Sequence, residues 1–157
     1  MNPIKVLFIC HGNICRSPMA EIIFKHLVHE TGLDDSFHIE SAGVSPEEWG
    51  NPIYSFAQRE IEKHGLKVDR TKHARAVGRD EYDDWDCFIV MERSNERGLL
   101  RIFGGDPQNK IHYMMEYTDT PGDVEDPWYS RNFSKVWDQI YRGCEGLLRH
   151  QMNQPGD

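Results

Sequence analysis

The chain has 157 residues and a formal net charge of −8, from 18 basic and 26 acidic side chains, which disfavours nucleic acids and anionic membranes as partners. Its length is that of one domain with a sizeable core, and no apolar run reaches a membrane-spanning length. We expect no signal peptide, because Met1–Pro3 lead directly into the first predicted strand. The four cysteines lack a disulfide-framework spacing, so we expect a reducing, cytoplasmic location without membrane contacts.

The first predicted elements are a buried strand at Val6–Ile9 and a helix at Met19–Glu30. Four consecutive apolar residues are typical of a parallel strand that is buried on both faces. The second segment has apolar residues at helical spacing, at Ala20, Ile23, Phe24, Leu27 and Val28. Ser17 and Pro18 suit the N-cap and the first turn of that helix. The residues between strand and helix therefore form a loop where backbone N–H groups and the helix dipole favour an anion.

This loop carries the residue types of a phosphate site with a nucleophile. A thiol at a helix N-terminus beside a fixed cation ionises readily, which makes Cys10 the candidate nucleophile. Arg16 follows six positions later, so the loop can turn its planar guanidinium toward two phosphate oxygens. Gly12 and Asn13 tolerate the left-handed backbone of a tight loop. The sequence therefore predicts an anion-binding cup with Cys10 at its floor.

The string Cys-x5-Arg-Ser-Pro, which begins at Cys10 directly after the first strand, resembles the low-molecular-weight protein tyrosine phosphatases. The resemblance covers nearly the whole chain and implies hydrolysis of protein phosphotyrosine through a cysteinyl phosphate. It implies no metal or other cofactor, a monomer, and binding of inorganic phosphate or similar oxyanions as product or inhibitors. The expected phosphate-binding loop consists of His11, Gly12, Asn13, Ile14, Cys15, Arg16 and Ser17. Ser17 is expected to donate a hydrogen bond to the thiolate.

Cys15 adds a redox prediction to the same loop. It lies five positions from Cys10, so the two sulfur atoms can approach disulfide distance when the loop curls. A readily ionised thiolate is also the form that peroxide oxidises first. We expect a reversible Cys10–Cys15 disulfide, for which the resemblance gives most of the support. The alternative is a small buried side chain under the loop.

A second strand is predicted at Phe37–Ser41, ending in the small residues that follow Ser41. In the resembled family a serine here braces the anion loop, so Ser41 is a candidate donor to Asn13, although a simple turn needs the same residues. The loop at Ser45–Pro52 contains Trp49. The resemblance places a residue of this loop on the rim of the pocket, whereas the alternative is a tryptophan that covers part of the core.

A helix is predicted over Pro52–His64, with one apolar face formed by Ile53, Phe56, Ala57 and Ile61. The polar segment Asp69–Arg75 follows it. There, His73 stands directly before Ala-Arg, which resembles the context of a family histidine that hydrogen-bonds the loop asparagine. His73 is therefore the candidate support for Asn13, and a solvent-facing histidine is the alternative.

The next predicted elements are a central strand at Asp86–Met91, a helix at Ser94–Phe103 capped by Ser94, and a weaker edge strand at Lys110–Met114. Strands that alternate with helices predict an α/β fold. The resemblance implies one domain over residues 1–157, with a four-stranded parallel sheet and helices on both faces, Rossmann-like and of the phosphotyrosine protein phosphatase I type. A last helix has apolar residues at Val136, Ile140, Cys144, Leu147 and Leu148, and Gln151–Asp157 are expected to fray.

Asp126 is the candidate general acid. It lies in a loop rich in prolines and acids, and an aspartic acid on such a loop can protonate a departing aryl oxygen. The family uses an Asp-Pro pair followed by aromatic residues, which Asp126, Pro127, Trp128 and Tyr129 match. The pair that begins at Asp106 follows two glycines and is typical of a turn. Trp128 and Tyr129 are expected to form a wall of a substrate slot, opposite Trp49 or His11.

Three other functions fit parts of the sequence. An arsenate reductase of this fold needs two further cysteines on a mobile segment, but Cys87 lies in an apolar strand and position 94 is serine. Protein-arginine phosphatases of this fold carry threonine at the position of Ile14, whose apolar side chain suits a phenyl ring. A phosphotyrosine-binding module without activity would lack one of the three catalytic candidates, Cys10, Arg16 and Asp126.

Overall fold

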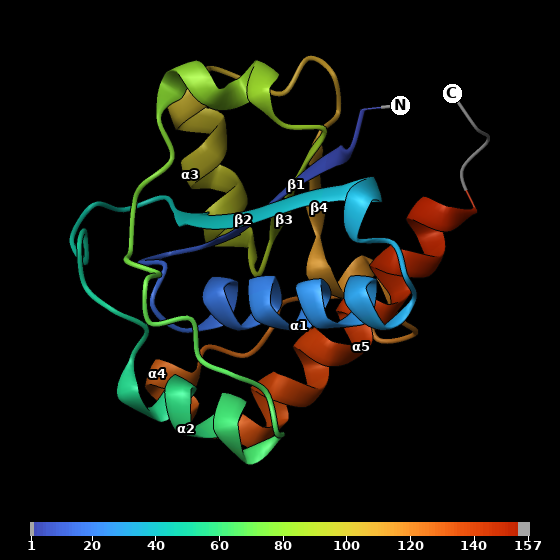
Figure 1. Cartoon of the computed structure of the whole chain (residues 1–157). Helices are drawn as coiled ribbons and strands as arrows, with labels where there is room; N and C mark the ends of the chain where they lie inside the picture. Colours follow the sequence, from blue (N-terminus) through green and yellow to red (C-terminus); the bar gives the residue numbers. More distant parts are fainter. Residues whose placement is uncertain (1, 154–157) are drawn as a thin grey trace.

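Four parallel strands form one sheet in the order β2-β1-β3-β4. Figure 1 shows this sheet in a computed structural model of the chain, in which residues 2–153 are described. The strands are β1 (Ile4–Cys10), β2 (Phe37–Gly43), β3 (Cys87–Val90) and β4 (Ile111–Tyr113). The predicted four-stranded parallel sheet is confirmed, and β4 lies at an edge as predicted.

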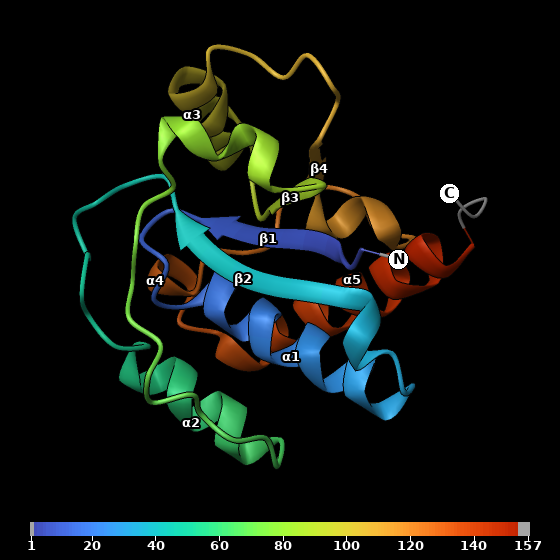
Figure 2. The ribbon, with the colours of Figure 1, turned by 45° about the horizontal axis from the view of Figure 1, so that its top comes forward.

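Helices cover both faces of the sheet, which confirms the predicted fold class. In Figures 1 and 2, α3 lies on one face, and α1, α2 and α5 lie on the other. The α-helices are α1 (Arg16–Glu30), α2 (Ser55–Lys63), α3 (Arg93–Phe103), α4 (Pro127–Ser130) and α5 (Phe133–Met152). Three short 3-10 helices complete the described part, η1 (Asp34–Ser36), η2 (Arg79–Asp84) and η3 (Met114–Tyr117).

Strand β1 passes between two hydrophobic cores. Val6 and Phe8 belong to the core that α1 and α5 cover, whereas Leu7 and Ile9 belong to the core beneath α3. All four side chains are fully buried, because successive residues of a strand point to opposite faces of a sheet that is covered on both sides. The buried part of β1 therefore ends at Cys10, which begins the loop.

The N-terminal caps of two helices differ from the prediction. Helix α1 begins at Arg16, with Cys15 as N-cap and no side-chain cap, so Ser17 is not the cap but a residue of the first turn. Helix α3 is capped by Glu92, not by Ser94. The side-chain oxygen of Asn95 accepts from the backbone N–H of Glu92, while the Ser94 hydroxyl donates to the Glu92 carboxylate. Both serine hydroxyls have other acceptors, which the spacing of cap residues does not reveal.

Helix α2 is shorter than predicted. It begins at Ser55, so Ile53 precedes it, and the Phe56 side chain is 38% exposed rather than on the buried face. The buried side chains of this helix are Ala57, Glu60 and Ile61. The predicted apolar face is therefore correct for Ala57 and Ile61 and wrong for Phe56.

Helix α5 is longer than predicted and continues through Met152. The prediction of fraying from Gln151 is wrong for Gln151 and Met152, and residues 154–157 lie outside the described residues. Within residues 2–153, none of the helices combines the length and the apolar character that a membrane crossing requires.

Candidate active site

The loop between Cys10 and Arg16 lies at the carboxyl end of β1, against the end of β2. Asn13 has a φ of 63°, the left-handed conformation expected for this loop. The backbone N–H groups of Val44 and Ser45 donate to the carbonyl of His11, which ties the loop to the chain after β2. A Cβ atom on Gly43 would lie 2.5 Å from the same carbonyl oxygen, so this close approach requires glycine.

The Cys10 thiol is at the floor of this loop and is almost fully buried. Its Sγ lies 3.0 Å from the hydroxyl of Ser17, on the first turn of α1. The Ser17 oxygen accepts a 2.8 Å hydrogen bond from the Asn13 side-chain amide. The hydroxyl proton of Ser17 then has Cys10 Sγ and the Ala42 carbonyl, at 3.5 Å, as acceptors. The sulfur is the nearer one, so this arrangement favours donation to Cys10.

Asn13 connects the loop to two other segments. Its amide nitrogen donates to the hydroxyls of Ser17 and Ser41, and its carbonyl oxygen accepts from the backbone N–H of Arg75 at 3.1 Å. Ser41 thus contacts Asn13 as the sequence suggested. The prediction that His73 supports Asn13 is wrong, because the Arg75 N–H occupies that acceptor and His73 is exposed beside its backbone bridge to Pro52.

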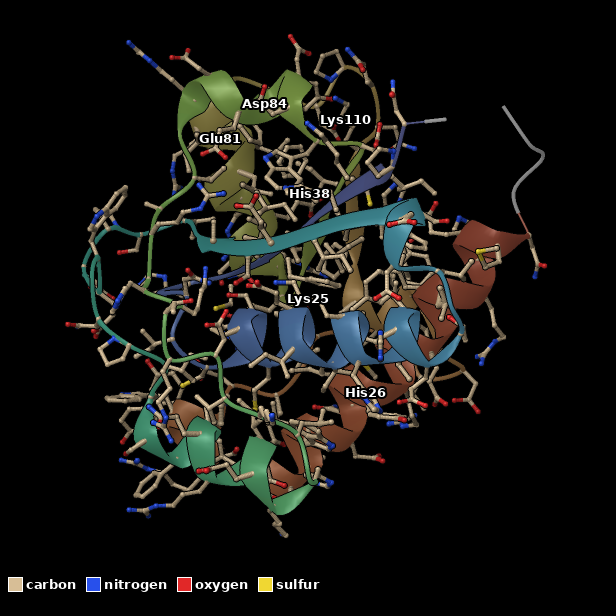
Figure 3. All side chains as sticks on the ribbon, viewed as in Figure 1. Lys25, His26, His38, Glu81, Asp84 and Lys110 are labelled. Carbon is tan, nitrogen blue, oxygen red and sulfur yellow. The ribbon has the colours of Figure 1, made fainter. Side chains whose placement is uncertain are left out.

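A buried carboxylate lies behind this network. Glu21 of α1 accepts from the Ser41 hydroxyl at 2.6 Å and, through its other oxygen, from Lys25 at 2.6 Å. Figure 3 shows Lys25 on α1, where it borders a cavity of about 730 Å³ between that helix and β2. Lys72 Nζ donates to the Ser41 carbonyl, and burial lowers its pKa. Sequence reasoning missed Glu21 and Lys72, and the only available signal was the helical spacing of Glu21 from Ser17.

Arg16 is almost fully buried and lines the same cavity as Cys10. One nitrogen donates to Glu92 Oε2 and to the Val124 carbonyl, both at 3.1 Å. Burial by itself favours the neutral form, but Cys10 and Glu92 together raise the pKa of Arg16 above its ordinary value. Burial by itself raises the pKa of Glu92, but the charge and hydrogen bond of Arg16, together with a hydrogen bond from Ser94, lower it below its ordinary value. Sequence reasoning missed both Glu92 and Val124, because no motif connects them to the loop.

Asp126 lies on the opposite side of the same guanidinium. Its Oδ2 is 3.6 Å from Arg16 Nη2, while its Oδ1 accepts from the backbone N–H of Trp128 as the N-cap of α4. Pro127 is the first residue of that helix. The chain just before Asp126 is fixed, because the N–H of Val124 donates to the Met91 carbonyl at 2.7 Å. Asp126 therefore lines the same cavity as Cys10 and belongs to a tethered segment.

These groups line one cavity of about 500 Å³. Its lining residues are Cys10, His11, Gly12, Ile14, Cys15, Arg16, Glu47, Glu48, Glu92, Asp126, Trp128 and Tyr129. Four of the five predicted rim residues are among them, and His11 Nε2 lies 2.7 Å from Glu47 Oε1. Trp49 does not line the cavity and is 61% exposed, so its predicted rim position is wrong. Its neighbours Glu47 and Glu48 occupy that part of the rim instead.

All four cysteines are free thiols in the structure. Burial, with a smaller contribution from Cys10, raises the pKa of Cys15 to about 12, so its thiol is protonated at neutral pH. Burial likewise raises the pKa of Cys87 to about 12, and Cys87 lies within strand β3 rather than on a loop. Such a thiol is unsuited to the cysteine relay of an arsenate reductase. Among residues 2–153, no three His, Cys, Asp or Glu side chains are grouped to hold a metal ion.

Comparisons with known proteins agree with this geometry. The family model for low molecular weight phosphotyrosine protein phosphatase matches residues 5–155. The low molecular weight protein-tyrosine-phosphatase YfkJ of Bacillus subtilis is 38% identical over 147 residues, which cover 92% of this chain and 94% of that protein. The crystal structure of YfkJ superposes with a TM-score of 0.91 and covers 97% of this chain and 98% of that one. A Drosophila arginine phosphatase has 31% sequence identity and a TM-score of 0.84, covering 97% of this chain and all of the other.

Proposed function

Because the chain belongs to the low molecular weight phosphotyrosine protein phosphatase family, we propose that Cys10, Arg16 and Asp126 carry out its reaction. The chain is a protein tyrosine phosphatase, and the reaction of its family proceeds through a cysteinyl phosphate. One observation supports the three roles. A single cavity is lined by a buried thiol, a buried guanidinium and an aspartate, and Arg16 Nη2 lies 3.6 Å from Asp126 Oδ2.

In the first step, the Cys10 thiolate attacks phosphorus in line with the tyrosyl oxygen. The S–P bond forms, the P–O bond to tyrosine breaks, and Asp126 transfers its proton to the departing oxygen. The backbone N–H groups of the loop and the Arg16 guanidinium bind the three equatorial oxygens, where charge is spread in the transition state. The pKa of Arg16 is raised, which keeps that cation in place.

In the second step, a water molecule hydrolyses the cysteinyl phosphate. The Asp126 carboxylate accepts a proton from the water as its oxygen bonds to phosphorus. The S–P bond breaks, the electron pair returns to Cys10, and inorganic phosphate leaves. Ser17, 3.0 Å from the sulfur, stabilises the thiolate that is released and so assists this step.

Replacing the nucleophile tests the scheme directly. Cys10→Ser is expected to abolish turnover of para-nitrophenyl phosphate and of phosphotyrosine peptides. Because the loop and Arg16 stay in place, the variant is expected to bind tungstate with an affinity close to that of the parent, which calorimetry measures. Undiminished turnover in this variant contradicts the assignment of Cys10.

Tyrosine is the side chain that the pocket supports best. Ile14 is partly buried and lines the cavity together with Trp128 and Tyr129, which gives a phenyl ring apolar and aromatic walls. The relative from Drosophila is an arginine phosphatase, so phosphoarginine is the second candidate substrate. Assays of matched phosphotyrosine and phosphoarginine peptides, side by side, decide between them. We expect turnover of the phosphotyrosine peptide to be the faster by at least tenfold.

We propose that residues 1–157 form one domain that acts as a cytoplasmic monomer and binds phosphate and related oxyanions at the loop. The free cysteines support a reducing location. The net charge of −8 supports a phosphoprotein rather than a nucleic acid as partner. Sedimentation of the purified chain tests the oligomeric state, since a dimer at assay concentration contradicts the expected monomer.

A further inference from the structure

Aromatic side chains continue outward from the cavity over the surface of the molecule. Tyr54, Phe56, Trp128 and Phe133 form a connected set, which we name the aromatic patch. The ring centroids of Tyr54 and Trp128 are 5.4 Å apart, those of Tyr54 and Phe56 are 5.4 Å apart, and those of Phe56 and Phe133 are 5.9 Å apart. The contact between Tyr54, the N-cap residue of α2, and Trp128 of α4 connects these two helices.

Part of this patch is open to solvent. Phe133 is buried beneath it, but the exposed fraction is 38% for Phe56 and 49% for Trp128. Rings in an ordinary core would be covered, and neighbouring exposed aromatic side chains are typical of a surface that binds another molecule. The backbone N–H of Tyr54 donates to the Ile14 carbonyl, so the patch is also connected to the phosphate-binding loop.

Two arginines lie over the exposed rings. The guanidinium carbon of Arg59 is 4.9 Å from the Phe56 centroid, and that of Arg131 is 5.5 Å from the Trp128 centroid. Among residues 2–153, neither guanidinium has a carboxylate within 4.0 Å, although the chain carries a net charge of −8. Stacking on a ring leaves the N–H donors at the edge of a guanidinium available. The patch therefore presents cationic donors beside apolar surface.

The aromatic patch adjoins the cavity, and this position indicates what the patch binds. Trp128 belongs both to the aromatic patch and to the lining of the cavity that holds Cys10. A phosphotyrosine in this cavity must place its neighbouring residues on the rim, and another part of that rim, Glu47 and Glu48, is acidic. We infer that the aromatic patch with Arg59 and Arg131 binds the substrate segment beside the phosphotyrosine, and that this segment carries acidic residues next to an apolar one. This inference rests on the proposed function.

Two phosphotyrosine peptides test the inference. They share their length and a phenylalanine near the phosphotyrosine and differ only in whether the flanking positions are acidic or lysine. The parent enzyme is expected to hydrolyse the acidic peptide with a kcat/KM roughly three- to tenfold higher, the size expected for two partly exposed ion pairs. In Arg59→Glu/Arg131→Glu this preference is expected to invert. Para-nitrophenyl phosphate, which has no flanking residues, reports the chemistry separately.

Arg97→Glu/Arg101→Glu is the matched control, because it makes the same change of charge on α3, which covers the other face of the sheet. It is expected to keep the preference of the parent. Equal kcat/KM for both peptides in an enzyme that hydrolyses them overturns this inference alone, as does an equal effect of the control variant. A dimer in sedimentation that Phe56→Ser dissociates assigns the patch to a second copy of the chain and overturns the inference as well. Failure to hydrolyse either peptide overturns the proposed function together with it.

Discussion

The hydroxyl of Ser41 donates to the buried carboxylate of Glu21 at 2.6 Å, and this bond holds Ser41 in the hydrogen-bond network behind Cys10. Because the Ser41 proton is used there, its oxygen accepts from the Asn13 amide at 3.0 Å. The same amide donates to Ser17, whose own proton is then directed to Cys10. Glu21 thus acts on the sulfur through three side chains, as a positioning residue.

Replacing Glu21 by glutamine removes the carboxylate that accepts from Ser41, with little change of side-chain volume. The amide of glutamine can donate to Ser41 and leave the Ser41 proton without this acceptor, which displaces Ser41, the Asn13 amide bonded to it and the Ser17 hydroxyl beside Cys10. We expect Glu21→Gln to lower kcat roughly tenfold, about the effect of one hydrogen bond to a charged group, with KM changed less than twofold. Burst kinetics is expected to show the loss in hydrolysis of the cysteinyl phosphate. Lys25→Met, which leaves the carboxylate in place, is the control, and an unchanged kcat in Glu21→Gln contradicts the role.

Asp126→Ala tests the general acid. Without a proton donor, a tyrosyl oxygen must leave as an anion, whereas an activated aryl oxygen leaves readily without help. We expect kcat to fall by about 10²- to 10⁴-fold with phosphotyrosine, and far less with aryl phosphates whose leaving groups are acidic. The measurement is a series of aryl phosphates that differ in the acidity of the phenol. Equal losses across the series remove Asp126 from this role.

Gly43→Ala is expected to disrupt the phosphate-binding loop. The added Cβ would lie 2.5 Å from the backbone oxygen of His11, and a backbone atom cannot move aside as a flexible side chain can. We expect kcat/KM to fall at least 100-fold, since displacement of reacting groups by about 1 Å costs that much. Gly78→Ala is the matched control, because its Cβ would meet only a Glu81 side-chain oxygen at 3.5 Å, an ordinary contact. A Gly43→Ala enzyme with parental kcat/KM shows that the loop tolerates the shift.

The ion pair of Glu92 with Arg16 predicts a pH dependence of stability. The folded-state pKa of Glu92 is lowered, so the pair stabilises the fold above about pH 4.3, the usual value for glutamate, and this contribution is lost as the pH falls toward the lower folded value. At pH 7 we expect Glu92→Gln to melt a few degrees below the parent. Thermal melts from pH 7 to pH 3 are expected to show this difference shrinking below about pH 4.3. A difference that stays constant across that range contradicts the linkage.

Cys15→Ser tests the redox prediction. Peroxide converts the Cys10 thiolate to a sulfenic acid, and the Cys15 thiol then displaces water to form the disulfide. The pKa of Cys15 is about 12, so Cys15 itself is not the first thiol oxidised. We expect the parent to regain most of its activity with dithiothreitol, and Cys15→Ser to regain much less, because its Cys10 is oxidised further. Equal recovery of the two proteins contradicts a protective disulfide.

Much of the fold could be predicted because its signals are local. The apolar run at Val6–Ile9 and the helical spacing after Ser17 each report burial of one element, and the alternation of strands and helices then predicts a parallel sheet. Helix starts were less accurate. The hydroxyls of Ser17 and Ser94 bond to groups on other segments or to a neighbouring carboxylate, and a cap rule cannot detect that competition.

The site residues could likewise be predicted only where they lie in a local motif. Cys10 and Arg16 lie in one short motif, whereas Glu92 and Val124 come from two segments that only the folded chain brings to the loop. Glu21 lies on the helix that continues the loop, but no motif distinguishes it from other acidic residues of that helix. The error at His73 has the same origin, because the group that binds Asn13 is the backbone N–H of Arg75, two residues later. Every residue except proline has such an N–H, so the residue type does not show which one binds.

Val124 is held at both of its backbone polar atoms, one by Met91 and one by Arg16. This anchor fixes the chain directly before the short segment 125–131, which carries Asp126. Arg16 and the segment that carries Asp126 are therefore held by contacts that do not depend on a substrate. Most of the electrostatic field around the reacting phosphorus is in place before the substrate arrives, so little reorganisation energy remains for the chemical steps.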